Sequence, residues 1–140
     1  MADKSDVLHV VAAVIYDTKK EHILIAKRPD EKHQGGKWEF PGGKVEAGEA
    51  AQIALQRELY EELGVQVSVA NPLIQINHQY SDKSIFLDVY EVFQFTGEAF
   101  GKEGQEVCWV KLDELATYTF PAANISILEA LGLDVARLSQ

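Results

Sequence analysis

The sequence predicts an α/β fold in which a mixed β-sheet lies between helices. The first observation is a series of short runs rich in β-branched, aliphatic and aromatic residues, which favour strands. The second is a pair of segments, residues 50–63 and 122–133, that favour helices. Strands interrupted by two helices suggest a sheet covered on both faces. At 140 residues without a linker or repeat, residues 1–140 are expected to form a single domain.

The expected strands are short runs separated by turns and by the first helix. Residues 7–16 and 22–28 flank a polar Asp-Thr-Lys-Lys turn, which predicts a hairpin. A short run at 38–40 leads into a glycine turn. Beyond the first helix, the remaining strands are expected at residues 65–80, 85–95 and 107–111.

The helix expected at residues 50–63 has good helix formers, no internal Gly or Pro, and Gly64 as a carboxy-terminal stop. Leu55, Leu59 and Leu63 recur at every fourth position and form an apolar stripe for the core. This segment is therefore predicted to pack against the sheet through one face.

Glu58, Glu61 and Glu62 fall beside that stripe on an arc about 100° wide. A solvated acidic face is the usual explanation. Against it, Glu58 and Glu62 repel each other at i, i+4, and only Arg57 offers a local partner, to Glu61. The glutamates also lie near the helix carboxy terminus, where the dipole disfavours anions. The residues alone leave open a solvated face or a site for Mg²⁺ or Mn²⁺, which carboxylate oxygens suit.

A spaced pattern of fixed residues begins at Gly43. Glu49 follows after five residues, and Arg57-Glu58-Leu59 after seven more. Glu61-Glu62 and Gly64-Val65 come next, each after one intervening residue. This pattern resembles the signature of the Nudix family at every specified position. The resemblance implies an α/β/α sandwich and metal-dependent hydrolysis of nucleoside diphosphates linked to another group. The metal site that it implies comprises the Gly43 carbonyl, Glu58, Glu61 and Glu62, with Glu49 beside them or as an occasional ligand. Arg57 would orient a catalytic glutamate, and Lys44 would lie near the phosphates.

Three further stretches, residues 37–43, 97–105 and 120–124, resemble the MutT branch of that family, whose members remove 8-oxo-dGTP from the nucleotide pool. The resemblance makes Glu103 a further metal ligand and a candidate general base. Taken in isolation, Glu103 is more simply a surface loop carboxylate. Sequence spacing does not decide between these two interpretations.

Asn124 is the residue expected to read the base. Its amide has a donor and an acceptor, which can pair with the O6 and N7–H edge of 8-oxoguanine. A site that accepts N7–H would reject guanine, because the mismatch leaves a buried polar group unpaired. The alternative is a helix N-cap, since Asn124 precedes an apolar helical segment.

Three more positions are candidates for binding the nucleotide. Tyr80 could pack against the base, the Asp82-Lys83 backbone could hydrogen-bond its edge, and Arg28 could hold a phosphate. Each is also an ordinary strand-end residue. Tyr80 and Ser81 stand where the MutT branch pattern has Phe and Pro, so this wall of the pocket departs from the branch.

The composition limits which partners the protein is expected to bind and in which cellular compartment it is expected to occur. A net charge of −9 argues against stable nucleic-acid binding, so a free nucleotide is the expected substrate. The apolar runs are too short to span a bilayer, and there is no signal-peptide pattern. The lone Cys108 fits a reducing cytoplasm. Nothing in the sequence suggests an oligomer interface, so we expect a cytoplasmic monomer.

The combined expectation is a Mg²⁺-dependent pyrophosphohydrolase, with Mn²⁺ as an alternative metal, that converts 8-oxo-dGTP to 8-oxo-dGMP and pyrophosphate. Water would attack the β-phosphorus, and Glu58 or Glu103 would take its proton. One alternative is a Nudix hydrolase for another nucleotide, such as CTP or ADP-ribose. Others are a nucleotide-binding module without hydrolytic activity and a purely structural domain with an acidic helix.

Overall fold

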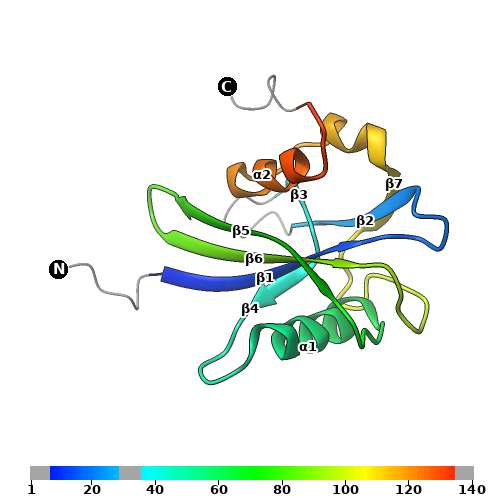
Figure 1. Ribbon diagram of the computed structural model, residues 1–140, viewed down its shortest axis with the longest axis horizontal. Coiled ribbons are helices and arrows are strands. Elements are labelled where there is room, and N and C mark those ends of the chain that lie inside the picture. The colour runs from blue at the N-terminus through cyan, green and yellow to red at the C-terminus, as the bar shows by residue number, and fades with distance from the viewer. Residues whose placement is uncertain (1–6, 29–35, 135–140) are drawn as a thin grey trace.

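The computed structural model describes residues 7–28 and 36–134, and Figure 1 shows the elements in space. The strands are β1 (Val7–Ile15), β2 (His22–Lys27), β3 (Trp38–Glu39), β4 (Gly42–Lys44), β5 (Asn71–Gln79), β6 (Ser84–Val92) and β7 (Val107–Lys111). The helices are α1 (Ala51–Leu63), α2 (Ala122–Ala130) and a 3₁₀ helix, Leu112–Thr117. The strand at residues 107–111 is confirmed, whereas β4 and the 3₁₀ helix were not expected.

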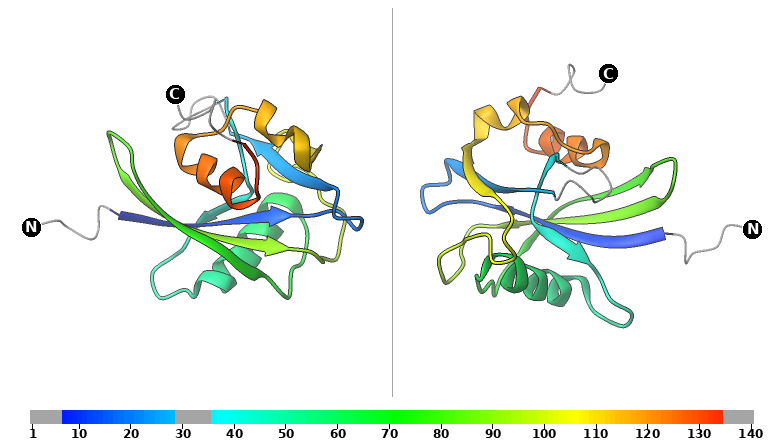
Figure 2. Two further views of the ribbon diagram at one scale, coloured as in Figure 1. Left: turned by 45° about the horizontal axis from the view of Figure 1, so that its top comes forward. Right: turned by 180° about the vertical axis from the view of Figure 1, so that it is seen from behind.

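A four-stranded mixed sheet lies between α1 and α2, which confirms the predicted architecture (Figures 1 and 2). Its strand order is β4-β1-β6-β5, with β1 and β6 parallel and both outer pairs antiparallel. Along β1, Ala12 and Val14 belong to the core under α2, while Val11, Ala13 and Ile15 belong to the core under α1. Burial on both faces explains why this strand reads as a continuous apolar run.

The hairpin predicted from residues 7–16 and 22–28 needs correction. A turn does join β1 to β2, but a single antiparallel bridge, Tyr16 to Ile23, connects them. The strands then separate, because β2 pairs with β3 and β7 in a second, three-stranded sheet. The pairing of β2 with distant strands satisfies its backbone, so the turn does not extend into a hairpin ladder.

The strand predicted at residues 65–80 begins only at Asn71. Val65 and Val67 are buried in the core under α1, and Gln66 forms an isolated bridge with Thr96. Alternation of buried and exposed residues therefore starts before the ladder with β6 does. The prediction was wrong for residues 65–70 because burial, not pairing, produces the pattern there.

Helix α1 forms where it was expected and buries the predicted stripe. Leu55, Leu59 and Leu63 are all inaccessible to solvent. Gly64 has a φ of 72°, in the left-handed region, and its N–H donates to the Tyr60 carbonyl. A residue with a side chain would be strained there, so Gly64 ends the helix as predicted.

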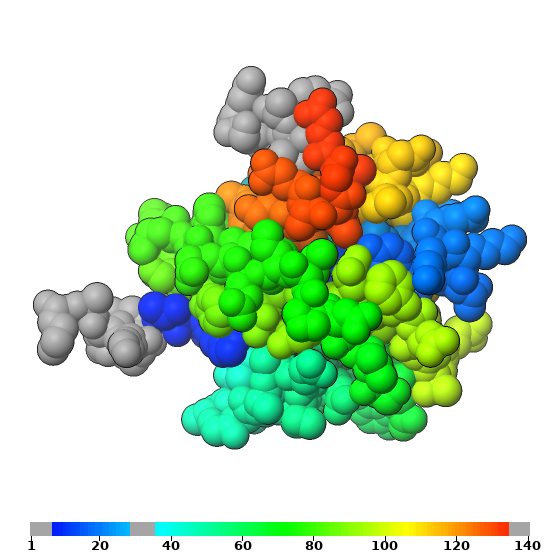
Figure 3. All heavy atoms as spheres, in the orientation of Figure 1, coloured from blue at the N-terminus to red at the C-terminus, as the bar shows by residue number. Residues whose placement is uncertain are grey.

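Helix α2 covers the other face of the sheet and packs on β5, as the space-filling view makes visible (Figure 3). Ala123, Ile127 and Leu128 are its buried residues. Among residues 7–28 and 36–134, no helix is long and apolar enough to cross a membrane.

Candidate active site

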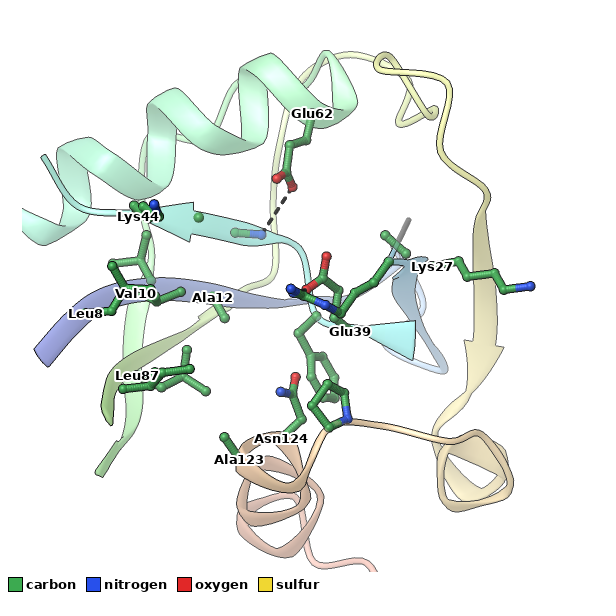
Figure 4. Close-up of a pocket in the computed structure, with 18 of the residues that line it drawn as sticks. Leu8, Val10, Ala12, Lys27, Glu39, Lys44, Glu62, Leu87, Ala123 and Asn124 are labelled. Carbon is green, nitrogen blue, oxygen red and sulfur yellow. Dashed lines mark hydrogen bonds and ion pairs between the residues drawn. The ribbon is translucent and has the colours of Figure 1, made fainter. Parts of the chain in front are cut away.

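A cleft of about 530 Å³ opens between the mixed sheet, the amino terminus of α2 and the end of α1. Its floor is apolar, because the sheet face toward α2 presents aliphatic side chains there. These floor residues, several of which Figure 4 labels, are Leu8, Val10, Ala12, Ile85 and Leu87. An apolar floor with polar groups at its edges suits a ligand that has a flat ring and a charged tail.

All five predicted substrate-binding residues line this cleft: Arg28, Lys44, Tyr80, Lys83 and Asn124. Of the predicted metal ligands, Gly43, Glu62 and Glu103 also line it. Glu58 lies directly behind Gly43, whereas Glu49 and Glu61 are not among the lining residues. Residues far apart in the sequence thus meet around one cavity.

The acidic end of the cleft is built on the last turns of α1. Glu62 Oε1 accepts a hydrogen bond from the Gly42 N–H at 3.2 Å, drawn in Figure 4. Burial, followed by the charges of Glu39, Glu58 and Glu103, raises the pKa of Glu62 to about 8, against the lowering effect of the Gly42 hydrogen bond. Burial also raises the pKa of Glu58, although Arg57 opposes that shift. Several carboxylates are therefore close enough to disfavour one another's charge.

Gly43 brings β4 against α1 at the closest point of this site. β4 pairs antiparallel with β1, with Val11 opposite Gly43. A Cβ built on Gly43 would collide with the Glu58 carboxylate. Glycine therefore lets the backbone pass beside this carboxylate without displacing it, which fits the expected role of the Gly43 carbonyl at a cation.

Arg57 organises the carboxylates around it. Its Nε and Nη2 atoms donate to both oxygens of Glu49, at 2.8 and 3.0 Å. Its Nη1 atom donates to Glu58 Oε2 at 3.0 Å and, less closely, to Glu61 Oε1 at 3.3 Å. Nη2 also reaches the Lys44 carbonyl at 3.0 Å. These bonds hold the Glu58 carboxylate in place, in the manner that the sequence predicts for Arg57.

Glu49 is occupied by that interaction. The hydrogen bonds from Arg57, and then the one from the Glu46 N–H, lower the pKa of Glu49 to about 2. With both oxygens bound to the guanidinium, Glu49 is not among the residues that line the cleft. Its contribution is to fix Arg57.

The chemistry of this donor set fits a hard divalent cation. Carboxylates that raise one another's pKa become stable as anions when a cation neutralises them. Within the part of the chain that the structure describes, however, no three Asp, Glu, His or Cys side chains approach closely enough to hold a metal. The individual ligands therefore stay a prediction.

At the other end of the cleft, Asn124 is the third residue of α2, and Pro121 is the N-cap. The Asn124 N–H donates to the Pro121 carbonyl at 2.9 Å, inside the first turn. The N-cap alternative for Asn124 is therefore wrong. Its side chain points into the cleft instead, toward Glu39 and the floor (Figure 4).

Tyr80 has a role that the sequence did not reveal. Its hydroxyl oxygen accepts a hydrogen bond from the Ala123 N–H at 3.0 Å. The bond joins the end of β5 to the first turn of α2, one residue before Asn124. Burial raises the pKa of Tyr80, so the hydroxyl keeps its proton. A phenylalanine could not make this contact.

Sequence reasoning missed three polar residues that line the cleft, Lys27, Glu39 and Gln105. Glu39 Oε1 accepts from Arg28 Nη1 at 2.6 Å, across the β2–β3 pair. Arg28 therefore forms an ion pair with Glu39 at the edge of the cleft. The alternation of Trp38, Glu39 and Phe40 signals a polar side chain facing away from the aromatic ones, but pairing with β2 was needed to place it.

Comparison with known proteins agrees with this geometry. The sequence model of the NUDIX domain matches residues 11–130, which is most of the chain. The chain belongs to the Nudix family. It is a Nudix hydrolase by that membership, and the resemblance seen in the sequence is confirmed.

Relatives differ in the nucleotide that their names give. The chain is 39% identical to a CTP pyrophosphohydrolase of Escherichia coli over 88% of its length and 90% of that protein's length. It is 42% identical to an 8-oxo-dGTP diphosphatase of Proteus vulgaris, over 74% of this chain and 91% of that one. A crystal structure of a MutT Nudix hydrolase from Burkholderia pseudomallei superposes with a TM-score of 0.80 at 30% identity, covering 89% and 98% of the two chains.

Proposed function

We propose that this protein hydrolyses 8-oxo-dGTP to 8-oxo-dGMP and pyrophosphate. Removal of the oxidised nucleotide from the cytoplasmic pool prevents its incorporation opposite adenine. The similarity to 8-oxo-dGTP diphosphatases supports this substrate. Mg²⁺ is the proposed metal, with Mn²⁺ as a substitute.

The observation that carries the proposal is the arrangement of one cleft with two chemically different ends. Glu62 and Glu103 line one end, and Asn124 lines the other, with aliphatic side chains between them. A nucleotide placed with its base on the aliphatic floor extends its phosphates toward the acidic end. The cleft therefore matches the polarity of a nucleoside triphosphate along its length.

Each group then has a defined task. The Asn124 amide pairs with the O6 and N7–H edge of the oxidised base. Arg28 and Lys44 bind phosphate oxygens. Glu58 or Glu103 takes the proton from the attacking water, and Arg57 holds Glu58 in place. A divalent metal at Gly43, Glu58, Glu61, Glu62 and Glu103 would polarise the phosphates and lower the pKa of the water.

The test is product analysis in Mg²⁺ and ¹⁸O-labelled water. Attack at the β-phosphorus places the label in pyrophosphate and leaves 8-oxo-dGMP unlabelled. A label in the monophosphate would contradict the proposed site of attack. Binding of 8-oxo-dGTP without turnover in Mg²⁺ or Mn²⁺ would instead indicate a binding module.

A second candidate substrate is CTP, because one relative with 39% identity is a CTP pyrophosphohydrolase. CTP has no purine edge for Asn124 to read, so the two substrates make different demands on that residue. The cleavage chemistry would be the same. Turnover of CTP that exceeds that of 8-oxo-dGTP, and that survives Asn124→Ala, would favour this candidate.

A further inference from the structure

Gln105 lies between the loop that carries Glu103 and the last turn of α1. Its Nε2 atom donates to the Glu62 carbonyl oxygen at 2.9 Å. Its Oε1 atom accepts from the Glu103 N–H at 3.0 Å. One side chain thus bonds to the backbone of an acidic residue on α1 and to the backbone of an acidic residue outside it.

The neighbouring loop residues are held to α1 in a different way. The Phe100 N–H donates to the Leu63 carbonyl at 3.1 Å, and the Lys102 N–H donates to the Glu62 carbonyl at 3.0 Å. These backbone bonds fix the first part of the loop. Gln105 extends the attachment to Glu103 itself, whose side chain is exposed at the loop tip.

Both halves of the Gln105 amide are used. A primary amide supplies a donor and an acceptor at a fixed separation, which an aliphatic or carboxylate side chain does not. We propose that Gln105 is a positioning residue that sets the Glu103 carboxylate opposite the carboxylates of α1 for hydrolysis. The inference rests on the proposed role of Glu103 in the reaction.

Two other roles for Gln105 make different predictions. Because Gln105 lines the cleft, it could contact the nucleotide directly, in which case its loss raises KM. It could also serve only the stability of the loop, in which case its loss acts independently of Glu103. If Gln105 positions Glu103, the loss of Gln105 lowers kcat, and this effect appears only when Glu103 is present.

The experiment measures kcat and KM for the nucleotide that the wild-type enzyme hydrolyses fastest. Gln105→Met keeps the length of the side chain and removes both bonds. We expect kcat to fall by about 10–100-fold, as for residues that orient metal ligands, with KM unchanged. Gln105→Asn keeps both polar groups of the amide but is one methylene too short to reach both partners, so kcat should fall by a similar factor. This variant replaces Gln105→Met in the test if the methionine variant folds poorly. Lys102→Ala is the matched control. Lys102 belongs to the same loop as Glu103, and its ammonium lies over the Tyr60 ring of α1, so this change should leave kcat unchanged.

The decisive comparison repeats Gln105→Met in a Glu103→Gln background. If Gln105 acts through Glu103, the second substitution changes kcat little once Glu103 is lost. An equal fall in both backgrounds, or a rise in KM alone, would overturn the proposal. If Glu103→Gln by itself leaves kcat unchanged, the proposed role of Glu103 fails, which is a separate result from additivity.

Discussion

The two ends of the cleft are built in opposite ways. At the acidic end, Glu58, Glu62 and the organising Arg57 all project from α1. At the base end, Tyr80 follows β5 and Asn124 lies in the first turn of α2, far along the chain. A single helix fixes the spacing of the first set, whereas tertiary packing brings the second set together. Most of the proposed catalytic groups thus come from one helix, joined by Glu103 from a loop, whereas the proposed selectivity depends on how separate elements meet.

The acidic end is also held together by more side-chain hydrogen bonds than the base end. Arg57 makes five hydrogen bonds to Glu49, Glu58, Glu61 and the Lys44 carbonyl. The bond that joins the two base-end elements beside Asn124 is that of the Tyr80 hydroxyl. Substitutions at the acidic end should therefore abolish turnover, while those at the base end should alter selectivity and leave the chemistry in place.

The largest effect is expected for Glu58→Gln. The change keeps the shape of the side chain but removes the charge next to Gly43, so kcat should fall by about 10²–10⁴-fold. Steady-state kinetics in saturating Mg²⁺ measures it. Glu129→Gln, an exposed change on α2, is the control. An unchanged kcat for Glu58→Gln would place the chemistry elsewhere.

Asn124→Ala should change selectivity more than rate. Loss of the amide leaves the edge of the oxidised base unpaired, at a cost of about 1–3 kcal/mol, which corresponds to roughly 5–150-fold in preference. The ratio of kcat/KM for 8-oxo-dGTP to that for dGTP reports it. Ser126→Ala, two residues later on the same helix, should leave the ratio intact. An equal loss on both substrates would mean that Asn124 does not read the base.

Mg²⁺ should stabilise the fold through the acidic end. At ten times its dissociation constant, a cation that binds only the folded state adds about 1.4 kcal/mol to the free energy of unfolding. Urea unfolding with and without Mg²⁺ measures this increment, and Glu58→Gln should reduce it. A stability that does not respond to Mg²⁺ or Mn²⁺ would support the purely structural alternative.

Tyr80→Phe should have the smallest effect, about 1 kcal/mol of folding stability, because it leaves the Ala123 N–H without its acceptor. A modest loss of preference for the oxidised nucleotide should accompany it, since Asn124 is the next residue. Tyr60→Phe, at an exposed site on α1, is the control for removal of a hydroxyl. Identical stability of Tyr80→Phe and the wild type would show that this bond does not secure α2.

The sequence predicts the helix at the acidic end well because helical periodicity is local. The Leu55, Leu59 and Leu63 stripe, the Gly64 stop and the Arg57–Glu61 pair all follow from positions within one helix. The contact of Arg57 with Glu58 is what the family resemblance implies. The same reasoning places α2 and most of the strands. Fold class and family membership are accordingly confirmed.

The sequence does not predict contacts that join separate elements. β1 and β2 read as a hairpin, yet β2 pairs with β7 in another sheet. Neither the Tyr80 bond to α2 nor the Gln105 bonds to Glu62 and Glu103 leave a periodic signal, because each depends on packing between distant segments. The cap alternative for Asn124 fails for the same reason, since the place of Asn124 in the helix depends on Pro121 starting the first turn.

The most direct test of the central claim is the ratio of kcat/KM for 8-oxo-dGTP to that for dGTP and CTP, measured on the wild-type enzyme in Mg²⁺. The cleft predicts a strong preference for the oxidised nucleotide, with 8-oxo-dGMP and pyrophosphate as products. Comparable turnover of 8-oxo-dGTP and dGTP, or a preference for CTP, would contradict the assignment of Asn124 as the group that reads the oxidised base.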